Sequence, residues 1–374
     1  MAGWAVTMVA RLSNNKETME IINLQDFKIV AMEKMLPQHF DYCAGGAEDE
    51  ITLRANKNSF GSIKLHQRVL RNISSVDTTV EILGQTMSMP VMIAPTAFQG
   101  LAHQDAEIAM VKAAGTTGVI MILSTLSNKS LEDVLAAASA PVWFQIYMYK
   151  EKKINEELIK RAENAGCSAL VITVDLPVQG KRESNIRNRF TLPPGLAIGN
   201  FEGGEMRGLP DKPTGSGLMQ YISTLFKHDL SWQDIKWLRS ITDLPLIVKG
   251  ILHVDDARLA LEHGVNGIIV SNHGGRQLDN CPATIDVLAE IVQVINNEIP
   301  VILDGGIRRG SDVVKALAFG ASATAIGRPT FWGLAVDGKV GVETVFSILK
   351  DELANTMAFC GVQSVSSIGP DIIV

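Results

Sequence analysis

Continuous apolar runs alternate along this chain with segments of helical periodicity. From residue 90 onward, eight short runs bounded by turn residues are almost wholly apolar: 90–95, 118–124, 142–147, 169–175, 245–250, 267–271, 300–306 and 323–329. Because apolar and polar residues do not alternate within them, these runs are typical of strands buried on both faces of a parallel sheet. The segments between them, such as AEIAMVKAAGTTG and VDDARLALEHG, have apolar residues at helical spacing, and several end in glycine.

Eight strand–helix units predict an α/β fold of the (β/α)8 TIM barrel type. The alternative is an open, doubly wound sheet, which usually carries a glycine-rich dinucleotide turn after its first strand. No GxGxxG motif follows the run at 90–95. We therefore expect a single barrel domain over residues 21–374, preceded by a disordered tail at 1–20.

Three segments outside the strand–helix units add to this picture. An N-terminal helical segment is expected, with helices at NLQDFKIVAMEKML, where Asn23 is the candidate N-cap, and at EDEITLRANKNSF. The connection at 176–230 after the fourth strand is rich in glycine and proline. A loop this long is normally a lid, a binding loop or a mobile segment, and we expect an active-site loop. The segment VGVETVFSILKDELANTMAFCG predicts a helix that packs on the barrel.

Composition narrows the class of protein. The net charge of −6 and the spread of basic residues argue against nucleic acid as a partner. The four cysteines show no CxxC spacing, which is typical of a reducing compartment. No apolar run reaches the roughly 20 residues of a membrane span, so no membrane partner is expected. The histidines show no HxxxH or HExxH pairing, so no metal is expected.

Two terminal segments bear on localisation. The first 16 residues lack acids and carry Arg11 and Lys16, a composition compatible with a transit peptide, although a disordered tail is favoured. The chain ends in PDIIV, which is not an SKL-type peroxisomal signal. We expect a cytoplasmic protein.

Polar residues collect where the predicted strands end. In strand order, these residues and their small neighbours are Thr96 and Ala97; Ser124; Gln145 and Tyr147; Thr173 and Asp175; Lys249; Ser271, His273 and Arg276; Asp304, Gly306 and Arg308; and Gly327 and Arg328. Each one alone is compatible with a core or capping role. Because a TIM barrel carries its chemistry at the carboxyl ends of its strands, the joint pattern indicates an active site.

The ends of the last two strands predict an anion site. DGGIRRG and IGRP combine glycines, whose backbone N–H groups can approach an anion, with Arg308, Arg328 and a helix start near Ser311. Barrels commonly hold a phosphate at this position. The alternative is a glycine turn with two surface arginines.

Three further residues suggest catalysis. Lys249 lies inside an apolar run, where it is either ion-paired, a fixed positive charge beside a group that becomes negative, or a Schiff-base lysine. His273 with Asp175 is a candidate general base held in one tautomer by a carboxylate, although a lone strand-end histidine is more often structural. Arg276 can bind a carboxylate through two parallel hydrogen bonds.

SNHGGRQLD, LDGGIRRG and IGRP together resemble the FMN-dependent 2-hydroxy acid oxidase family, which includes glycolate oxidase and L-lactate oxidase. DYCAGGAEDEITL and LPPGLAIGNFEG resemble the glycolate oxidase branch. The resemblance implies an (S)-2-hydroxy-acid oxidase that binds FMN, converts L-lactate, glycolate or both to the 2-oxo acid, and reduces O2 to H2O2. It also implies a homotetramer or homo-octamer.

The resemblance assigns roles by position. His273 matches the base, Asp175 its carboxylate partner, and Tyr147 the tyrosine near the substrate oxygen. Arg182, Arg276 and Tyr42 match the residues that hold the substrate carboxylate. Lys249 matches the lysine beside flavin N1 and O2, where a cation meets the negative charge of the reduced ring. The remaining FMN contacts are Thr96, Ala97, Ser124, Gln145, Thr173, Ser271, Asp304, Gly306, Arg308, Gly327 and Arg328.

One position departs from the family pattern. Leu126 stands where plant-type glycolate oxidases have tryptophan, which enlarges or reshapes the substrate pocket and removes an N–H donor. We therefore expect lactate, and longer 2-hydroxy acids, to be accepted at least as well as glycolate. Phe98 is a candidate for the same wall.

Three other functions are alternatives to the oxidase. They are a dehydrogenase with a non-oxygen acceptor, a catalytically silent flavin-binding protein, and a flavin-dependent isomerase.

Overall fold

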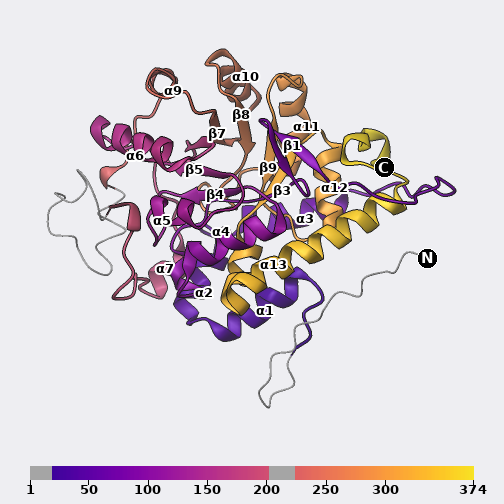
Figure 1. Cartoon of the computed structure of the whole chain (residues 1–374), viewed down its shortest axis with the longest axis horizontal. Helices are drawn as coiled ribbons and strands as arrows, with labels where there is room; N and C mark the ends of the chain where they lie inside the picture. Colours follow the sequence, from indigo (N-terminus) through magenta and orange to yellow (C-terminus); the bar gives the residue numbers. More distant parts are fainter. Residues whose placement is uncertain (1–18, 202–223) are drawn as a thin grey trace.

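The eight apolar runs form eight parallel strands that close into a barrel (Figure 1), which confirms the predicted fold. The computed structural model describes residues 19–201 and 224–374, so most of the predicted tail at 1–20 lies outside it. The barrel strands are β3 (Val91–Ile93), β4 (Met121–Ser124), β5 (Val142–Ile146), β6 (Ala169–Thr173), β7 (Leu246–Ile251), β8 (Gly267–Val270), β9 (Val301–Asp304) and β10 (Ala323–Ile326). Strand β10 pairs with β3 to close the ring. Most strands are shorter than the predicted runs because the polar and glycine residues at the run ends belong to the loops.

Helices surround the barrel (Figure 1). They are α4 (Ala106–Thr117), α5 (Leu131–Ala136), α6 (Lys152–Ala165), α9 (Trp232–Arg239), α10 (Val254–Glu262), α11 (Thr284–Ile295), α12 (Gly310–Ala318) and α13 (Arg328–Phe359). The backbone of α13 is not helical at Asp337 and Gly338, so α13 consists of a barrel helix followed by the predicted C-terminal helix. No described helix is both long and apolar enough to cross a membrane.

The N-terminal segment contains one helix more than predicted. Helix α1 (Leu24–Lys34) has the predicted cap, because the Asn23 side chain accepts hydrogen bonds from the first turn. Helix α3 (Ile51–Ser62) matches the second predicted helix. Between them lies α2 (Pro37–Ala44), which begins with proline at its first position. Its eight residues are too few for a clear apolar period.

A short antiparallel hairpin, which the sequence pattern did not reveal, covers the other end of the barrel. Its strands are β1 (Val80–Ile82) and β2 (Gln85–Met87). Ile82 and Met87 pack against the barrel interior. The Gln85 side chain accepts hydrogen bonds from Trp143 and Ser168, which lie where β5 and β6 begin. The hairpin therefore closes the barrel at the end where its strands start.

The described part of the long connection is docked on the barrel. It contains α7 (Glu183–Arg187) and the 3-10 turn η2 (Gly199–Phe201), whereas residues 202–223 lie outside the described part. The Asn128 side chain donates to the Ala197 carbonyl over 2.8 Å, and that of Asn200 donates to the Thr125 carbonyl over 2.9 Å. These bonds tie the connection to the loop after β4.

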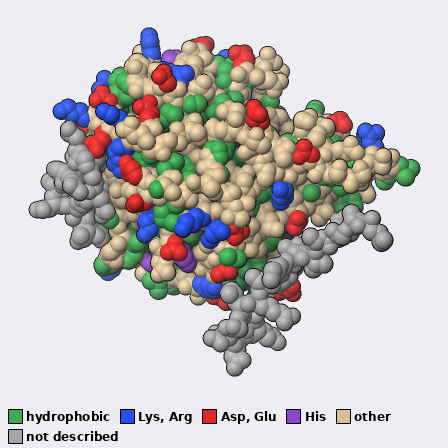
Figure 2. All heavy atoms as spheres, in the orientation of Figure 1, with side chains coloured by type: hydrophobic (Ala, Val, Ile, Leu, Met, Phe, Trp, Pro, Cys, Tyr) green, Lys and Arg blue, Asp and Glu red, His purple; other side chains and the backbone are tan. Residues whose placement is uncertain are grey.

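Charged side chains of both signs are mixed on the face of the molecule that Figure 2 shows. On the face in Figure 2, Lys and Arg side chains alternate with Asp and Glu, without a large patch of one sign. This dispersion agrees with the absence of clustered basic residues in the sequence.

Candidate active site

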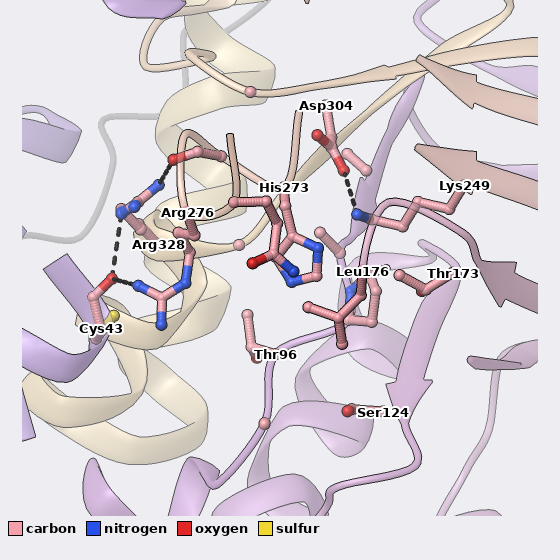
Figure 3. Close-up of a pocket in the computed structure, with 18 of the residues that line it drawn as sticks. Cys43, Thr96, Ser124, Thr173, Leu176, Lys249, His273, Arg276, Asp304 and Arg328 are labelled. Carbon is pink, nitrogen blue, oxygen red and sulfur yellow. Dashed lines mark hydrogen bonds and ion pairs between the residues drawn. The ribbon is translucent and has the colours of Figure 1, made fainter. Parts of the chain in front are cut away.

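A cavity opens at the end of the barrel where the strands finish (Figure 3). Most predicted site residues line it: Tyr42, Thr96, Ala97, Ser124, Leu126, Tyr147, Thr173, Arg182, Lys249, His273, Arg276, Asp304, Gly306, Arg308, Gly327 and Arg328. The other three lie behind this lining and hydrogen-bond to it: Gln145, Asp175 and Ser271.

His273 stands on the loop after β8, with its imidazole in the cavity (Figure 3). Its φ of +57° is a left-handed conformation uncommon outside glycine. Its Nδ1 lies 2.8 Å from Asp175 Oδ1. Burial lowers the pKa of His273 below its ordinary value, although Asp175 opposes this shift. The ring is therefore neutral at pH 7, and when Nδ1–H donates to Asp175, Nε2 is left as a proton acceptor.

Lys249 is buried at the end of β7 beside two carboxylates. Its Nζ donates to Ser271 Oγ over 2.9 Å, and it lies 3.6 Å from Asp304 Oδ2 and 3.7 Å from Asp175 Oδ2. Burial alone lowers the pKa of Lys249, but Asp304 and Asp175 outweigh it, and the pKa lies above its ordinary value. The ammonium is therefore permanently charged. This charge favours the fixed-cation interpretation over a Schiff base, which needs a neutral amine.

Asp175 links the imidazole to the ammonium. Burial raises the pKa of this carboxyl, but His273 and the Lys249 ammonium more than compensate, so that the pKa lies below its ordinary value. One carboxylate therefore orients the candidate base through Oδ1 and faces the cation through Oδ2.

Four half-buried guanidiniums line the rest of the cavity without carboxylate partners. Within the described residues, Arg182, Arg276, Arg308 and Arg328 form no salt bridge, and the hydrogen bonds they donate go to backbone carbonyls. Burial lowers the pKa of Arg328 to about 9, and those of Arg182 and Arg308 to about 10. A charge that is removed from water destabilises the protein unless it is paired. This excess of positive charge therefore indicates that the cavity binds anions.

Two of these arginines converge on the end of α2. Arg328 donates to the Cys43 carbonyl over 3.1 Å (Figure 3). The Gly45 carbonyl accepts from Arg328 over 2.9 Å and from Arg276 over 2.8 Å. The C-terminal end of a helix carries partial negative charge. The missed helix α2 therefore helps to hold two of the cations in place.

The loop after β9 has the form of a phosphate cradle. Gly305 and Gly306 have φ of +94° and +92°, and a Cβ on Gly306 would lie 1.9 Å from the Asn56 carbonyl oxygen. Only glycine fits there. Helices α12 and α13 begin close by, at Gly310 and Arg328, and helix N-termini favour anions. Within the described residues, the buried Asp304 Oδ1 has no hydrogen-bond partner, so it can accept a bond from a ligand hydroxyl.

Aromatic and aliphatic side chains form one wall of the cavity. Tyr42 stacks on Phe190 with ring centroids 4.6 Å apart, and the Arg276 guanidinium lies 5.3 Å from the Tyr42 ring centroid. Phe98 is fully buried 5.9 Å from Tyr42, and its N–H donates to the Leu126 carbonyl over 3.2 Å. Leu126 therefore lines the cavity, whereas Phe98 packs behind Tyr42 and is not one of the lining residues.

Several contributors were missed by the sequence analysis. The remaining lining includes Cys43, Leu176, Gln179, Phe226, His228, Gln277 and Phe331. Asn56 of α3 forms two side-chain hydrogen bonds with Asn272, of 2.8 and 2.7 Å, beneath the His273 loop. An asparagine at a helical position gives no sequence signal for this contact, although Asn272 lies within the quoted motif.

The sequence model of the FMN-dependent dehydrogenase family matches residues 31–374. The chain belongs to this family. A glycolate oxidase of Arabidopsis thaliana, glycolate oxidase 3, is 48% identical over 350 residues, covering 94% of this chain and 95% of the relative. The 2-hydroxyacid oxidase of Dictyostelium discoideum is 50% identical over 343 residues, covering 91% of this chain and 87% of the relative.

Solved structures of mandelate oxidase have the same fold. One of them superposes with a TM-score of 0.87 at 38% identity, covering 93% of this chain and 97% of that one. The predicted family, fold and cofactor class are thus confirmed, and the chain is an FMN-dependent 2-hydroxy acid oxidase.

The residues of this cavity fit FMN. A phosphate matches the cradle at Gly306 with Arg308 and Arg328, and a ribityl hydroxyl matches the unpartnered oxygen of Asp304. The Lys249 ammonium would stabilise the negative charge that a flavin ring acquires when it accepts electrons.

Proposed function

We propose that His273, Arg182 and Arg276 carry out the oxidation of an (S)-2-hydroxy acid on FMN held at the base of this cavity. The observation that carries the assignment is that one cavity contains both a neutral imidazole oriented by Asp175 and half-buried guanidiniums that lack carboxylate partners. A 2-hydroxy acid brings the carboxylate that the arginines lack and the hydroxyl proton that the imidazole can take.

The substrate carboxylate binds between Arg182 and Arg276, with the Tyr42 hydroxyl beside it. Two guanidiniums fix the carboxylate in one orientation, which turns the hydroxyl toward His273 Nε2 and the α-carbon toward the flavin. Tyr147, whose pKa burial raises, keeps its proton and donates to the substrate oxygen.

His273 then takes the hydroxyl proton. The resulting imidazolium is stabilised by Asp175, which lies 2.8 Å from Nδ1 and stays ionised. When bound, FMN supplies the two-electron acceptor that no side chain provides. Lys249 holds a fixed positive charge where negative charge develops, so it contributes without moving a proton.

The residues proposed to hold FMN divide by the part of the cofactor they face. Ring contacts come from Thr96, Ala97, Ser124, Gln145, Thr173 and Lys249, ribityl contacts from Ser271 and Asp304, and phosphate contacts from Gly306, Arg308, Gly327 and Arg328. The hydrogen bonds from Ser124 Oγ to Gln145 and from Gln145 to Thr173 support a shared orientation of the ring contacts.

Oxygen is the proposed electron acceptor, with H2O2 as product, and L-lactate is the proposed substrate alongside glycolate. The oxidase names of the relatives support the first point and the Leu126 wall supports the second. The alternative remains a dehydrogenase with another acceptor. A single barrel domain over 21–374, a homotetramer or homo-octamer, and a cytoplasmic location stay predictions.

The test is an aerobic assay of the purified yellow holoenzyme with glycolate, L-lactate and longer L-2-hydroxy acids. We expect equimolar 2-oxo acid and H2O2, with a kcat/KM for L-lactate at least equal to that for glycolate. Bleaching of the flavin by L-lactate without air, combined with failure to form H2O2 in air, would support the dehydrogenase. No bleaching by any 2-hydroxy acid would refute the proposed function.

A further inference from the structure

The two arginines of the proposed carboxylate clamp come from distant parts of the chain and repel each other. Arg182 lies at the start of α7 and Arg276 on the loop after β8. Burial, followed by the charge of Arg276, lowers the pKa of Arg182. Their direct link is weak, since Arg182 Nε lies 3.5 Å from the Arg276 carbonyl oxygen. Before a carboxylate arrives, other contacts must hold these like charges together.

The side chain of Gln277 provides such a contact. Its Oε1 accepts a hydrogen bond of 2.9 Å from the backbone N–H of Gly180, a residue 97 positions away in the chain. Gln277 is 9% exposed and lines the same cavity. The bond therefore joins the residue that follows Arg276 to a residue two positions before Arg182.

Gly180 fits this contact because it lacks a side chain. A Cβ there would lie 2.3 Å from the Arg276 carbonyl oxygen and 2.6 Å from Gln277 Cα. The backbone of the long connection is thus pressed directly on the backbone of the His273 loop. The neighbouring Lys181 carbonyl also accepts a bond of 2.9 Å from the Glu48 N–H, so this segment is held on two sides.

We propose that Gln277 is a positioning residue that latches the long connection to the His273 loop and thereby preorganises Arg182 against Arg276 for the substrate carboxylate. The proposal rests on the proposed function for the identity of the bound group, but the latch itself is a property of the free enzyme. Gln277 Nε2 is buried without a hydrogen-bond partner among the described residues, so the amide acts through its oxygen.

This mechanism predicts a division between KM and kcat. Without the latch, Arg182 spends part of its time away from Arg276, and a substrate carboxylate must pull it back. Saturating substrate restores the clamp, so kcat changes little. The KM rises about tenfold, which corresponds to the free energy of about one hydrogen bond.

The experiment compares holoenzymes of the wild type, Gln277→Met, Gln277→Glu and Val178→Ala. Methionine removes the acceptor, glutamate keeps it, and Val178 is a 71% exposed residue of the same segment. Hydrogen–deuterium exchange followed by mass spectrometry reports on residues 178–187 without substrate. We expect about tenfold faster exchange in Gln277→Met and wild-type exchange in the other two. We also expect the rise in KM in Gln277→Met and wild-type kinetics in Val178→Ala.

Unchanged exchange in Gln277→Met would overturn the proposal, and so would a change of equal size in Val178→Ala. If Gln277→Met does not fold, Gly180→Ala, which displaces the segment while leaving Gln277 in place, must reproduce the faster exchange, and wild-type exchange in that variant overturns the latch. If the wild type turns over no 2-hydroxy acid, the proposed function fails, whereas the exchange data still decide the latch.

Discussion

At the scale of single residues, the site works through shared partners. Asp175 contacts both His273 and Lys249, so one carboxylate keeps the imidazole oriented and the ammonium compensated. The imidazole stays neutral because burial outweighs the carboxylate. The sequence suggested the first pair from residue types alone, whereas the position of Lys249 between two carboxylates is visible only in the structure.

The neutral imidazole predicts the pH dependence. Only unprotonated His273 can accept the proton, so kcat/KM for L-lactate falls as pH drops through a pKa below the ordinary imidazole value of about 6.5. Asp175→Asn removes the charge that raises this pKa, so its acid limb moves to lower pH and its plateau drops by about 10²–10⁴. The exposed Asp255→Asn is the control. An acid limb above pH 6.5 would contradict the neutral base.

The wall residue Leu126 predicts substrate choice. Leu126→Trp narrows the pocket, so it lowers kcat/KM for L-lactate relative to glycolate by about tenfold. One methylene in an apolar pocket changes the transition-state free energy by about 1–3 kcal/mol, and a tenfold change lies within that range. The ratio is measured by steady-state kinetics for both acids in wild type and variant. An unchanged ratio would show that this wall does not contact the methyl group of lactate.

At the scale of secondary-structure elements, the N-terminal helices are part of the site. Helix α2 directs its carbonyls at Arg276 and Arg328, and α3 supplies Asn56 beneath the loops after β8 and β9. Neither helix belongs to the barrel. The strand-end pattern points only to barrel loops, so it could not reveal their contribution.

The Asn56–Asn272 pair predicts a stability effect with a functional consequence. Asn56→Leu removes both side-chain hydrogen bonds and leaves part of the Asn272 amide unpaired, so the free energy of unfolding falls by about 1–3 kcal/mol. FMN affinity falls as well, because the Asn56 side chain also lies against Gly305 in the loop after β9. Urea unfolding and flavin titration measure the two effects. The exposed Asn58→Leu, in the same helix, serves as control and leaves both unchanged.

At the scale of the whole molecule, the barrel concentrates positive charge at one end of a protein whose net charge is −6. Strands from all parts of the chain end there, so arginines far apart in sequence gather without paired acids. The repulsion among these charges destabilises the folded apoprotein, and bound anions remove that destabilisation.

The arginine cluster predicts that anions stabilise the apoprotein. The apoprotein is stabilised by inorganic phosphate, by about 2.7 kcal/mol at 100 times its Kd. Arg328→Met removes one guanidinium of this cluster, so its apoprotein loses part of the phosphate response and binds FMN weakly. Thermal unfolding with phosphate, against sodium chloride at equal ionic strength, measures this. An undiminished stabilisation of Arg328→Met by phosphate would contradict the argument.

The sequence by itself determined the barrel and predicted that the residues at its strand ends gather at one end. Strands buried on both faces must be continuously apolar, and the carboxyl ends of strands in a closed parallel barrel must meet at one end, so both follow from local patterns. The tertiary structure alone decided how the site is held: the β1–β2 hairpin at the opposite end, helix α2, Asn56 against Asn272, and Gln277 on Gly180. These contacts join segments far apart in the chain, and a local pattern of apolar and polar residues carries no information about which distant backbone a side chain will meet.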